Sequence, residues 1–391
     1  MCSEGRWTQR RIATNLPSYP VAQHFLPFLR PLLDYGIGSW RVALATERKS
    51  WLGCAAVEAK STLEIGNLML QRLRTVLRTL MTALLFLALP ARAETTLRVG
   101  HFPNITHIQG LVAHALSRQG KGFLEPRLGS DVKIEWFVYN AGPSAMEAIF
   151  AKSIDFTYVG PNPAINAYTK ARGEGVRIIA GAAEGGSALV IHGESTLSTA
   201  ADFRGKIVAT PQLGNTQDVV ARAWLKGGGL RITQTGGDAT VLPTANPDQL
   251  LLFKQRQIDA VWTVEPWISR LELEAGGKVL VDDRRAITTV LVASAELMKA
   301  QPELARKFAA AHRELTEWIK GNPAEAKKLA REELLAETRT EFPEALLERC
   351  WNRITLTSEI ATDVLKQSVS DAQAAGFLRD APDITGLMAK P

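Results

Sequence analysis

The chain has 391 residues, of which 46% are hydrophobic and 22% are charged, a composition and length that suit two globular lobes. Its formal charge is +6, but residues 1–93 hold 12 of the 46 basic and 5 of the 40 acidic side chains, which leaves 34 basic against 35 acidic in the remainder. A body this close to neutral excludes electrostatic binding of DNA or RNA as the main activity, so we expect no nucleic-acid partner.

Residues 69–93 contain the three parts of a secretory signal peptide in order. Arg72, Arg74 and Arg78 form a basic start, residues 80–89 form an apolar run too short to span a bilayer, and Ala91-Arg92-Ala93 is an A-x-A cleavage site. We expect cleavage after Ala93 and a periplasmic protein; the alternatives are a packed N-terminal helix or a membrane anchor. We interpret residues 1–68 as a non-native upstream extension.

From residue 95 the chain alternates β-rich runs with helical stretches. The first series predicts strands at 97–102, 133–139, 156–159, 176–180 and 188–192, and helices at 108–119, 144–152 and 163–171. The second series predicts strands at 206–210, 239–243, 260–263, 278–281 and 288–293, and helices at 216–226, 247–254 and 266–275. This alternation predicts an α/β fold with mainly parallel, doubly wound sheets.

The C-terminal part is expected to be helical. Beyond Ser294 the sequence is punctuated by Pro302, Pro323 and Pro343, and proline suits the first turn of a helix, so we expect each to begin one.

An internal repeat indicates that the two series are built alike. Residues 154–163 read IDFTYVGPNP and residues 258–266 read IDAVWTVEP, each an Ile-Asp pair, a strand with an aromatic residue, and a proline that opens a helix. Two such turns would face each other across a cleft, beyond the carboxyl ends of the strands, where α/β sheets bind ligands. The alternative is coincidence, because strand–proline–helix turns are common.

These segments resemble the aliphatic-sulfonate, taurine and nitrate-binding family of ABC importer subunits, which are periplasmic binding proteins of the type II-like fold. The resemblance covers nearly all of residues 95–391 and none of 1–68. The chain departs from the family pattern between residues 281 and 288, where the segment that connects two predicted strands is shorter than is usual in the family. The segments that carry the resemblance are VGHFPNITH (99–107), VYNAGPSAMEA (138–148), DFTYVGPNPAINAY (155–168), IIAGAAEGGSALVI (178–191), DFRGKIVATPQLGNTQD (202–218) and residues 246–282.

The resemblance implies two doubly wound α/β lobes joined by crossing strands, with a helical C-terminal tail. It implies a first lobe of residues 95–191 plus 286–391 and a second lobe of residues 192–285. The lobes would close on one small anion, most simply an aliphatic sulfonate. Taurine, nitrate, bicarbonate and a thiamine-precursor pyrimidine remain alternatives. The expected partners are an inner-membrane ABC permease and its ATPase, and the protein is expected to be a monomer.

Predicted helix starts supply candidate ligand-binding residues. Unpaired backbone N–H groups and the helix dipole bind anions without a formal positive charge. Glycine admits a ligand close to the backbone, and asparagine and threonine add donors; plain helix capping is the alternative at each position. The candidates at these starts are Asn140, Gly142, Gly160, Asn162, Asn215 and Thr216.

The opening loop, residues 102–107, is expected to line the cleft. Phe102 is expected to cover an organic group, and Asn104 and Thr106 to donate hydrogen bonds. We interpret His107 as a residue of the helix start. Gly186 precedes the crossing strand, where it either presents an amide or marks a turn.

Glu265 and Trp267 complete the candidate site. Trp267 is expected to stack on the ligand. Glu265 stands at a helix start, which its charge favours, so a structural role is the alternative. A Glu265 that faced the cleft would repel a dianion and suit a ligand bearing a hydroxyl, an amine or a protonated ring nitrogen.

Catalysis and cofactors are not expected. The sequence has no G-x-S-x-G, no phosphate-loop motif and no G-x-G-x-x-G that opens a helix after a strand. Cys350 is the only cysteine after the signal peptide, and the histidines have no metal-ligand spacing with it or with one another. The remaining alternatives are an enzyme of this fold that acts on a heterocycle, and a ligand-sensing regulator, for which residues 1–68 lack a helix-turn-helix.

Overall fold

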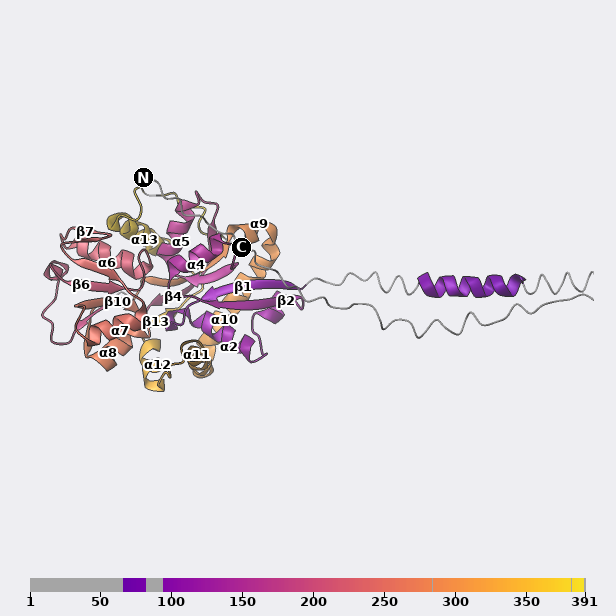
Figure 1. Cartoon of the computed structure of the whole chain (residues 1–391), viewed down its shortest axis with the longest axis horizontal. Helices are drawn as coiled ribbons and strands as arrows, with labels where there is room; N and C mark the ends of the chain where they lie inside the picture. Colours follow the sequence, from indigo (N-terminus) through magenta and orange to yellow (C-terminus); the bar gives the residue numbers. More distant parts are fainter. Residues whose placement is uncertain (1–65, 82–93, 283, 381, 390–391) are drawn as a thin grey trace, which may run out of the picture. The chain divides into compact units, whose positions relative to one another are not determined.

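The computed structural model describes residues 66–81, 94–282, 284–380 and 382–389 (Figure 1). The chain divides into two units, residues 1–90 and residues 91–391. The predicted upstream extension to residue 65, most of the apolar run and the cleavage site fall outside the described residues.

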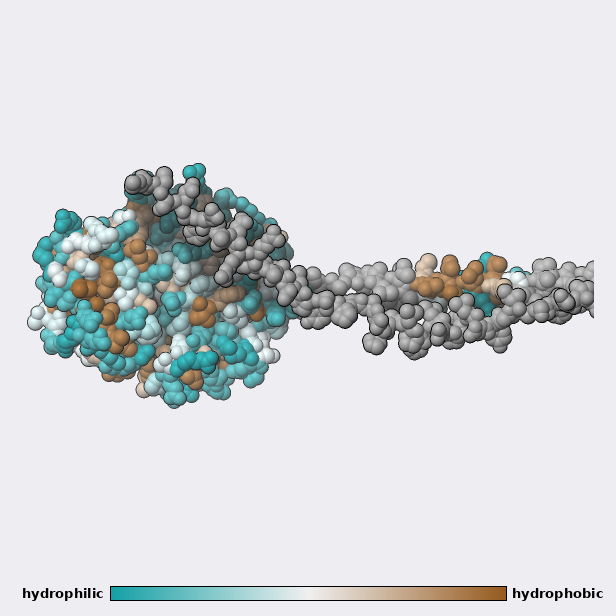
Figure 2. All heavy atoms as spheres, in the orientation of Figure 1, coloured by the Kyte–Doolittle hydropathy of each residue, from teal (hydrophilic) through white to brown (hydrophobic). Residues whose placement is uncertain are grey.

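In the first unit, residues 66–81 form a helix whose side chains are all exposed. Figure 2 shows hydrophobic residues along it. Its exposed large hydrophobic side chains include Leu73, Leu77 and Leu80. No helix of the described part has the length and apolar character needed to cross a bilayer.

The second unit contains two large sheets, each covered by helices on both faces. The six-stranded sheet defines the first lobe, and its strands lie in the order β13 (Ile354–Leu356), β4 (Val176–Gly185), β12 (Ile287–Ser294), β3 (Phe156–Val159), β1 (Thr95–His101) and β2 (Val132–Val138). One face packs on α2 (Ile108–Arg118), α10 (Pro302–Gly321) and α11 (Pro323–Thr338). The other face packs on α4 (Gly142–Phe150), α5 (Pro161–Lys170) and α13 (Thr362–Ala375).

The five-stranded sheet defines the second lobe. Its strands lie in the order β11 (Gly277–Asp282), β5 (Ser187–His192), β10 (Ala260–Val264), β6 (Ile207–Thr210) and β9 (Thr240–Pro243). One face packs on α6 (Thr216–Gly227), and the other on α7 (Asn246–Lys254) and α8 (Trp267–Ala275). The prediction of mainly parallel sheets is wrong: among the described strands of the two large sheets, only β1–β2, β1–β3, β6–β9 and β6–β10 pair in parallel, and the other pairings are antiparallel. Short elements complete the chain: η1 (Ile105–His107), α3 (Glu125–Leu128), η2 (Ala200–Phe203), β7 (Ile232–Thr233), β8 (Gly236–Gly237) and α9 (Ala295–Ala300).

The repeat predicted from the sequence has the same geometry in both lobes. In the first lobe the carboxylate of Asp155 accepts a hydrogen bond from the backbone N–H of Arg98, and the N–H of Asp155 donates to the Arg98 carbonyl. In the second lobe Asp259 makes the same two bonds with Ile207. Each aspartate therefore ties the start of its strand, β3 or β10, to the neighbouring parallel strand, β1 or β6.

The chain crosses between the sheets at Gly185-Gly186, between β4 and β5, and returns between β11 and β12. Both glycines have positive φ, +70° and +65°, and a side chain at either would collide with neighbouring atoms. The sequence predicted the first boundary after residue 191, but β5 already belongs to the second sheet. The turn occurs earlier because these two glycines permit it.

The C-terminal part joins the lobes as well as completing the first one. Pro302 and Pro323 begin α10 and α11 as predicted, whereas Pro343 lies one residue before α12 (Glu344–Trp351). One segment expected to be helical is instead β13, which pairs antiparallel with β4. α13 packs against both α5 and α6, and α12 contacts α8, so the tail touches both lobes (Figure 1).

Candidate ligand-binding site

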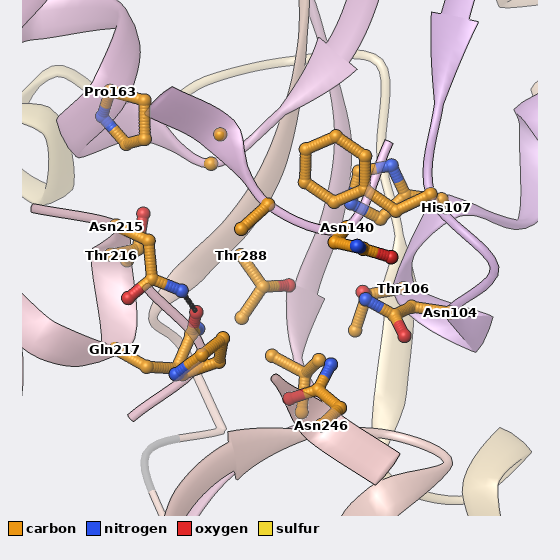
Figure 3. Close-up of a pocket in the computed structure, with 16 residues that line it drawn as sticks. Asn104, Thr106, His107, Asn140, Pro163, Asn215, Thr216, Gln217, Asn246 and Thr288 are labelled. Carbon is orange, nitrogen blue, oxygen red and sulfur yellow. Dashed lines mark hydrogen bonds between the residues drawn. The ribbon is translucent and has the colours of Figure 1, made fainter. Parts of the chain in front are cut away.

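A pocket with about 360 Å³ of empty space lies between the two lobes, at the carboxyl ends of the strands. Polar side chains from both lobes surround it (Figure 3). This figure includes space that is open to solvent at the pocket mouth. The lining residues are Phe102, Asn104, Thr106, His107, Asn140, Ala141, Gly142, Gly160, Pro163, Pro211, Asn215, Thr216, Gln217, Asn246, Val264 and Thr288.

Four helices begin at this pocket. α4 starts at Gly142, α5 follows Gly160, α6 starts at Thr216 and α7 starts at Asn246. The first N–H groups of a helix have no partner within the helix, and at α4, α5 and α7 no side chain caps them. The pocket therefore collects backbone donors and the positive ends of four helix dipoles.

Asn215 is a helix cap, as the alternative interpretation proposed. Its Oδ1 accepts a hydrogen bond from the N–H of Asp218 at 2.9 Å, and its Nδ2 donates to Gln217. Asp218 is itself held by Arg222, Thr210 and the N–H of Gly214. The start of α6 is therefore rigidly positioned before any ligand arrives.

Two buried polar atoms in the pocket lining have no hydrogen-bond partner: Nδ1 of His107 and Oγ1 of Thr216. Buried polar groups are normally paired, so unpaired atoms that line a cavity mark positions where a ligand can bond. Both residues are almost fully buried.

The pocket is polar but uncharged. Among the described residues, no lysine, arginine, aspartate or glutamate lines it. Burial, assisted by nearby His101, lowers the pKa of His107 well below its ordinary value, so His107 is neutral. Its ring stacks on Phe102 with the ring centroids 4.2 Å apart. An anion in this pocket would be held by dipoles and hydrogen bonds.

The lobes are in contact at the pocket. A Cβ atom added to Gly160 of the first lobe would lie 2.2 Å from Oγ1 of Thr216 in the second lobe. The side chain of Trp267 also reaches across, since its Nε1 donates to Oδ1 of Asn104 at 3.1 Å. The cleft is thus closed in this conformation, and Gly160 is small enough to permit the closure.

A larger cavity with about 1,090 Å³ of empty space shares Asn104, Asn140 and Asn246 with the pocket. Trp267 lines this outer cavity, and the guanidinium of Arg270 lies 4.9 Å from its ring centroid. The rest of the lining is partly apolar and includes Val138, Pro247, Leu250 and Phe342. Trp267 therefore lies beside the outer cavity, while the lining of the pocket itself does not include it.

Eight of the predicted residues line the pocket: Phe102, Asn104, Thr106, Asn140, Gly142, Gly160, Asn215 and Thr216. Asn162 does not, because its side chain donates to the Ser368 carbonyl in α13. Gly186 lies at the crossover, where its missing side chain makes room for Ile354 and Thr106. Both have structural explanations in this fold.

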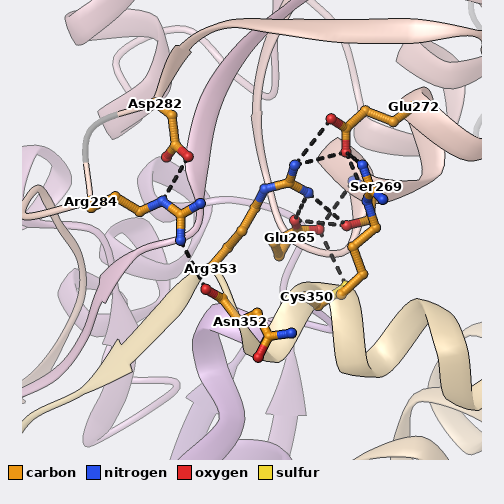
Figure 4. A network of polar contacts seen from close by, with 9 residues as sticks. Glu265, Ser269, Glu272, Asp282, Arg284, Cys350, Asn352 and Arg353 are labelled. Atoms are coloured by element: carbon orange, nitrogen blue, oxygen red, sulfur yellow. Dashed lines mark hydrogen bonds and ion pairs between the residues drawn. The ribbon is translucent and has the colours of Figure 1, made fainter.

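Glu265 has its carboxylate turned into a polar network at the crossing between the lobes (Figure 4). It is fully buried and pairs with Arg353 at 3.0 Å, and Ser269 and Cys350 donate to it as well. Burial lowers the pKa of Arg353, but the charges of Glu265 and Glu272 outweigh burial and the net shift is upward. Burial, with the nearby Glu265 charge, raises the pKa of Cys350, so its thiol is inert. The Glu265 carboxylate is therefore neutralised within the protein.

The sequence interpretation did not include Gln217, Asn246 and Thr288, and it assigned His107 to a helix start. Asn246 had a local signal, because Asn246-Pro247 is a polar residue before a helix-opening proline, like the starts that were chosen. Thr288 lies on the returning strand β12, where nothing in the sequence distinguishes it from the buried residues around it.

The architecture, two doubly wound lobes with a pocket between them, is that of the periplasmic binding proteins. The chain is similar in fold to the alkanesulfonate-binding protein of Xanthomonas axonopodis pv. citri bound to MOPS, with a TM-score of 0.59, 20% identity and coverage of 74% of this chain and 96% of that one. It is also similar to the nitrate-binding protein of Synechocystis PCC 6803, with a TM-score of 0.58, 14% identity and coverage of 74% and 83%. This likeness concerns the fold, and it confirms the predicted fold class.

The sequence comparisons identify the family. The model of the NMT1-like family matches residues 91–333, and the chain belongs to that family. A protein of Brucella abortus (strain 2308), named as a candidate binding protein, is 27% identical over 254 residues, which cover 62% of this chain and 73% of the relative. A candidate aliphatic sulfonates-binding protein of Escherichia coli (strain K12) is 31% identical over 156 residues, 38% of this chain and 46% of the relative. These relatives are named as binding proteins, in agreement with the prediction that the chain is not an enzyme.

Proposed function

We propose that this protein is the substrate-binding component of an ABC-type importer. It captures a small organic anion between its lobes and delivers it to an inner-membrane permease that a separate ATPase drives. The observation that carries the proposal is the convergence of four helix N-termini on a pocket whose described lining has no charged side chain. Such a pocket binds and releases an anion, and its lining offers no nucleophile with an adjacent base.

Within this class, the ligand is an aliphatic sulfonate. A pocket without lysine or arginine suits a singly charged head group better than a dianion, because it provides dipoles and no full positive charge to offset the second negative charge. The outer cavity gives an aliphatic chain apolar neighbours in Leu250, Trp267 and Phe342. The names of the Xanthomonas and Escherichia relatives support this choice.

The protein is exported and acts as a periplasmic monomer. Support comes from the order of basic start, apolar run and A-x-A site in residues 69–93, and from the exposure of every side chain in the helix of residues 66–81, which forms no core of its own. The periplasmic protein should begin at Glu94, and intact mass spectrometry of a periplasmic extract tests this start.

Thermal unfolding of the purified protein tests the ligand. The panel contains alkanesulfonates, taurine, nitrate, bicarbonate, phosphonates and thiamine-precursor pyrimidines. A ligand at about 1,000 times its Kd stabilises the folded state by roughly 4 kcal/mol, which raises Tm by several degrees. A rise with alkanesulfonates alone supports the sulfonate; a rise with only another compound replaces it; no rise with any of these anions contradicts the proposal.

A further inference from the structure

A compact cluster of titratable side chains lies behind the pocket, where β1, α2 and α11 meet. His101 is the last residue of β1, His114 lies in α2, and Glu337 lies in α11. Nε2 of His101, Nδ1 of His114 and Oε1 of Glu337 face one another, and the side chains of His101 and Glu337 are almost fully buried. None of the three residues lines the ligand pocket.

The spacing of these atoms matches one face of a metal coordination sphere. The distance from His101 Nε2 to Glu337 Oε1 is 2.9 Å, and His114 Nδ1 lies 3.1 Å from each of the other two atoms. Ligands about 2.1 Å from an ion lie about 3.0 Å apart in octahedral geometry and about 3.4 Å apart in tetrahedral geometry. The three atoms can therefore bind one ion with little or no movement.

The surroundings orient the ligands. Nδ1 of His101 lies 3.4 Å from the Phe102 carbonyl, which favours the tautomer that leaves a lone pair on Nε2, the arrangement usual for a metal-binding histidine. Oε2 of Glu337 is buried and has no hydrogen-bond partner, although a carboxylate oxygen in that setting normally has one. Coordination through both carboxylate oxygens, Oε1 and Oε2, would give this buried oxygen a partner.

The local charge also favours a cation. Glu333 lies 2.8 Å from His114 Nδ1, so two carboxylates adjoin the imidazoles, while one half-exposed guanidinium, that of Arg118, pairs with Glu333. The excess negative charge needs a proton or a metal ion. Burial lowers the pKa of His114, but its hydrogen bonds to Glu333 and Glu337 outweigh burial and raise it, so a proton on His114 is the competing occupant.

We propose that His101, His114 and Glu337 form a binding site for a divalent transition-metal ion such as Zn²⁺, Co²⁺ or Ni²⁺. Imidazole and carboxylate are suitable ligands for these ions. Arg118 Nη2 lies 3.2 Å from His114 Nε2 and must turn away when that nitrogen carries the proton; its exposure on the surface permits this. The ion enters from the outer cavity, which Glu337 also lines.

A metal ion here would brace the pocket. His101 immediately precedes Phe102, the first residue of the loop that lines the ligand site, and α11 would be fixed to β1 through the ion. The role is structural, independent of which ligand the protein carries, and does not depend on the proposed import function.

The test is whether the purified protein binds metal. Equilibrium dialysis measures binding of Zn²⁺, and the visible absorption spectrum of the protein with Co²⁺ reports binding of that ion. Trp136 provides a local signal, because its ring stacks on His114 with centroids 5.3 Å apart, so Ni²⁺ should quench its fluorescence in the wild type and not in a Trp136→Phe variant. We expect one equivalent of metal and a higher Tm with Zn²⁺ than with a chelator.

Two ligand variants and one control decide the outcome. Glu337→Gln preserves the shape of the side chain, and His114→Gln changes a partly exposed side chain, so both variants should fold. Each should weaken Zn²⁺ binding by more than about 100-fold. That is the upper end of the loss in affinity when a residue that only supports a metal ligand is replaced. His192→Gln alters a histidine of the second lobe that bonds the Ile258 carbonyl and should bind metal normally. The proposal is overturned if the wild type binds no metal, or if both ligand variants bind Zn²⁺ as tightly as the wild type. The three side chains would then form a protonated ion cluster without a metal.

Discussion

The ligand pocket and the Glu265 network both connect the two lobes, but they do so by opposite means. The pocket presents uncharged donors, two of its buried polar atoms are unpaired, and its described lining has no charged side chain. In the network, Glu265 is fully buried and its carboxylate accepts hydrogen bonds from Arg353, Ser269 and Cys350. The two are joined, because the Glu265 carbonyl accepts a hydrogen bond from the N–H of Ile105 in the pocket loop.

The difference follows from what each region has to do. A site that must release its ligand cannot leave a strong, unpaired charge behind when it empties, since an isolated buried charge is costly. Dipoles at helix starts avoid that cost, because water can replace the ligand. The network has no exchangeable partner, so it can use full charges to hold α8 against the segment between α12 and β13. Each of the following changes tests one side of this contrast.

The largest expected effect is on stability, from Arg353→Leu. This change leaves the Glu265 carboxylate buried without its counter-ion, and breaking a buried pair in this way costs about 3–5 kcal/mol. The free energy of unfolding from urea titration measures the loss. Adding Glu265→Gln to the variant removes the uncompensated charge and should recover most of it.

The matched control for Arg353→Leu is Lys299→Leu, which breaks an exposed ion pair with Glu174. Exposed pairs contribute little, so its urea midpoint should not change. Equal urea midpoints for Arg353→Leu and Lys299→Leu would show that the Glu265 network contributes no more to stability than an exposed ion pair does.

The second effect is on binding, from Asn104→Asp. The new side chain has the same shape and can still accept the hydrogen bond from Trp267, but it places a negative charge in a pocket that has none. Repulsion at close range in a poorly solvated site should weaken anion binding by about 100-fold, or roughly 2.7 kcal/mol. Calorimetric titration with the anion found in the ligand screen provides the measurement.

Asn322→Asp makes the same chemical change at an exposed position away from the pocket and should bind like the wild type. If Asn104→Asp bound the anion as tightly as Asn322→Asp, the head group would have to lie elsewhere.

The third effect tests closure, through Gly160→Ala. The added methyl group would overlap Oγ1 of Thr216 in the closed form, so the lobes must stay slightly apart. We expect roughly tenfold weaker binding, about 1.4 kcal/mol, with little change in unliganded stability. Thr216→Ala removes the obstructing oxygen, so the double variant should bind more tightly than Gly160→Ala alone.

Gly227→Ala is the control for the added methyl group, because a Cβ at Gly227 meets no atom within 4 Å. Additive losses in the Gly160→Ala/Thr216→Ala double variant would argue against contact between these two residues in the bound state.

The fold could be predicted because its signals are local. Alternation of strands and helices places the elements, and the Ile-Asp repeat leads to the matching bonds of Asp155 and Asp259. Helix starts marked by glycine, asparagine and proline likewise led to five pocket residues, and the opening loop led to Phe102, Asn104 and Thr106. The crossover was misplaced because Gly185-Gly186 looks like an ordinary turn, and only the pairing of β5 with β10 shows that the sheet has already changed.

The charged regions could not be predicted, because their partners are distant in sequence. Glu265 and Arg353 are 88 residues apart, and His114 and Glu337 are 223 residues apart. No periodicity or spacing relates such pairs in a single sequence. Glu265 was therefore assigned to the cleft, and the histidines were judged to have no metal-ligand spacing, although the fold brings two of them together with a glutamate.

The smallest expected effect comes from Trp267→Phe, which separates the two roles of this side chain. Phenylalanine retains an aromatic surface beside the outer cavity but cannot donate to Asn104, so the pocket loop loses one cross-lobe hydrogen bond. A bond of this kind contributes about 1 kcal/mol, and we expect roughly fivefold weaker binding by calorimetry. Trp224→Phe, a change in the apolar core of the second lobe between Phe203 and Trp262, should leave affinity unchanged. Equal affinities of Trp267→Phe and the wild type would mean that closure does not depend on this bond. The contrast between the uncharged pocket and the Glu265 network would then rest on Gly160 and Glu265 alone.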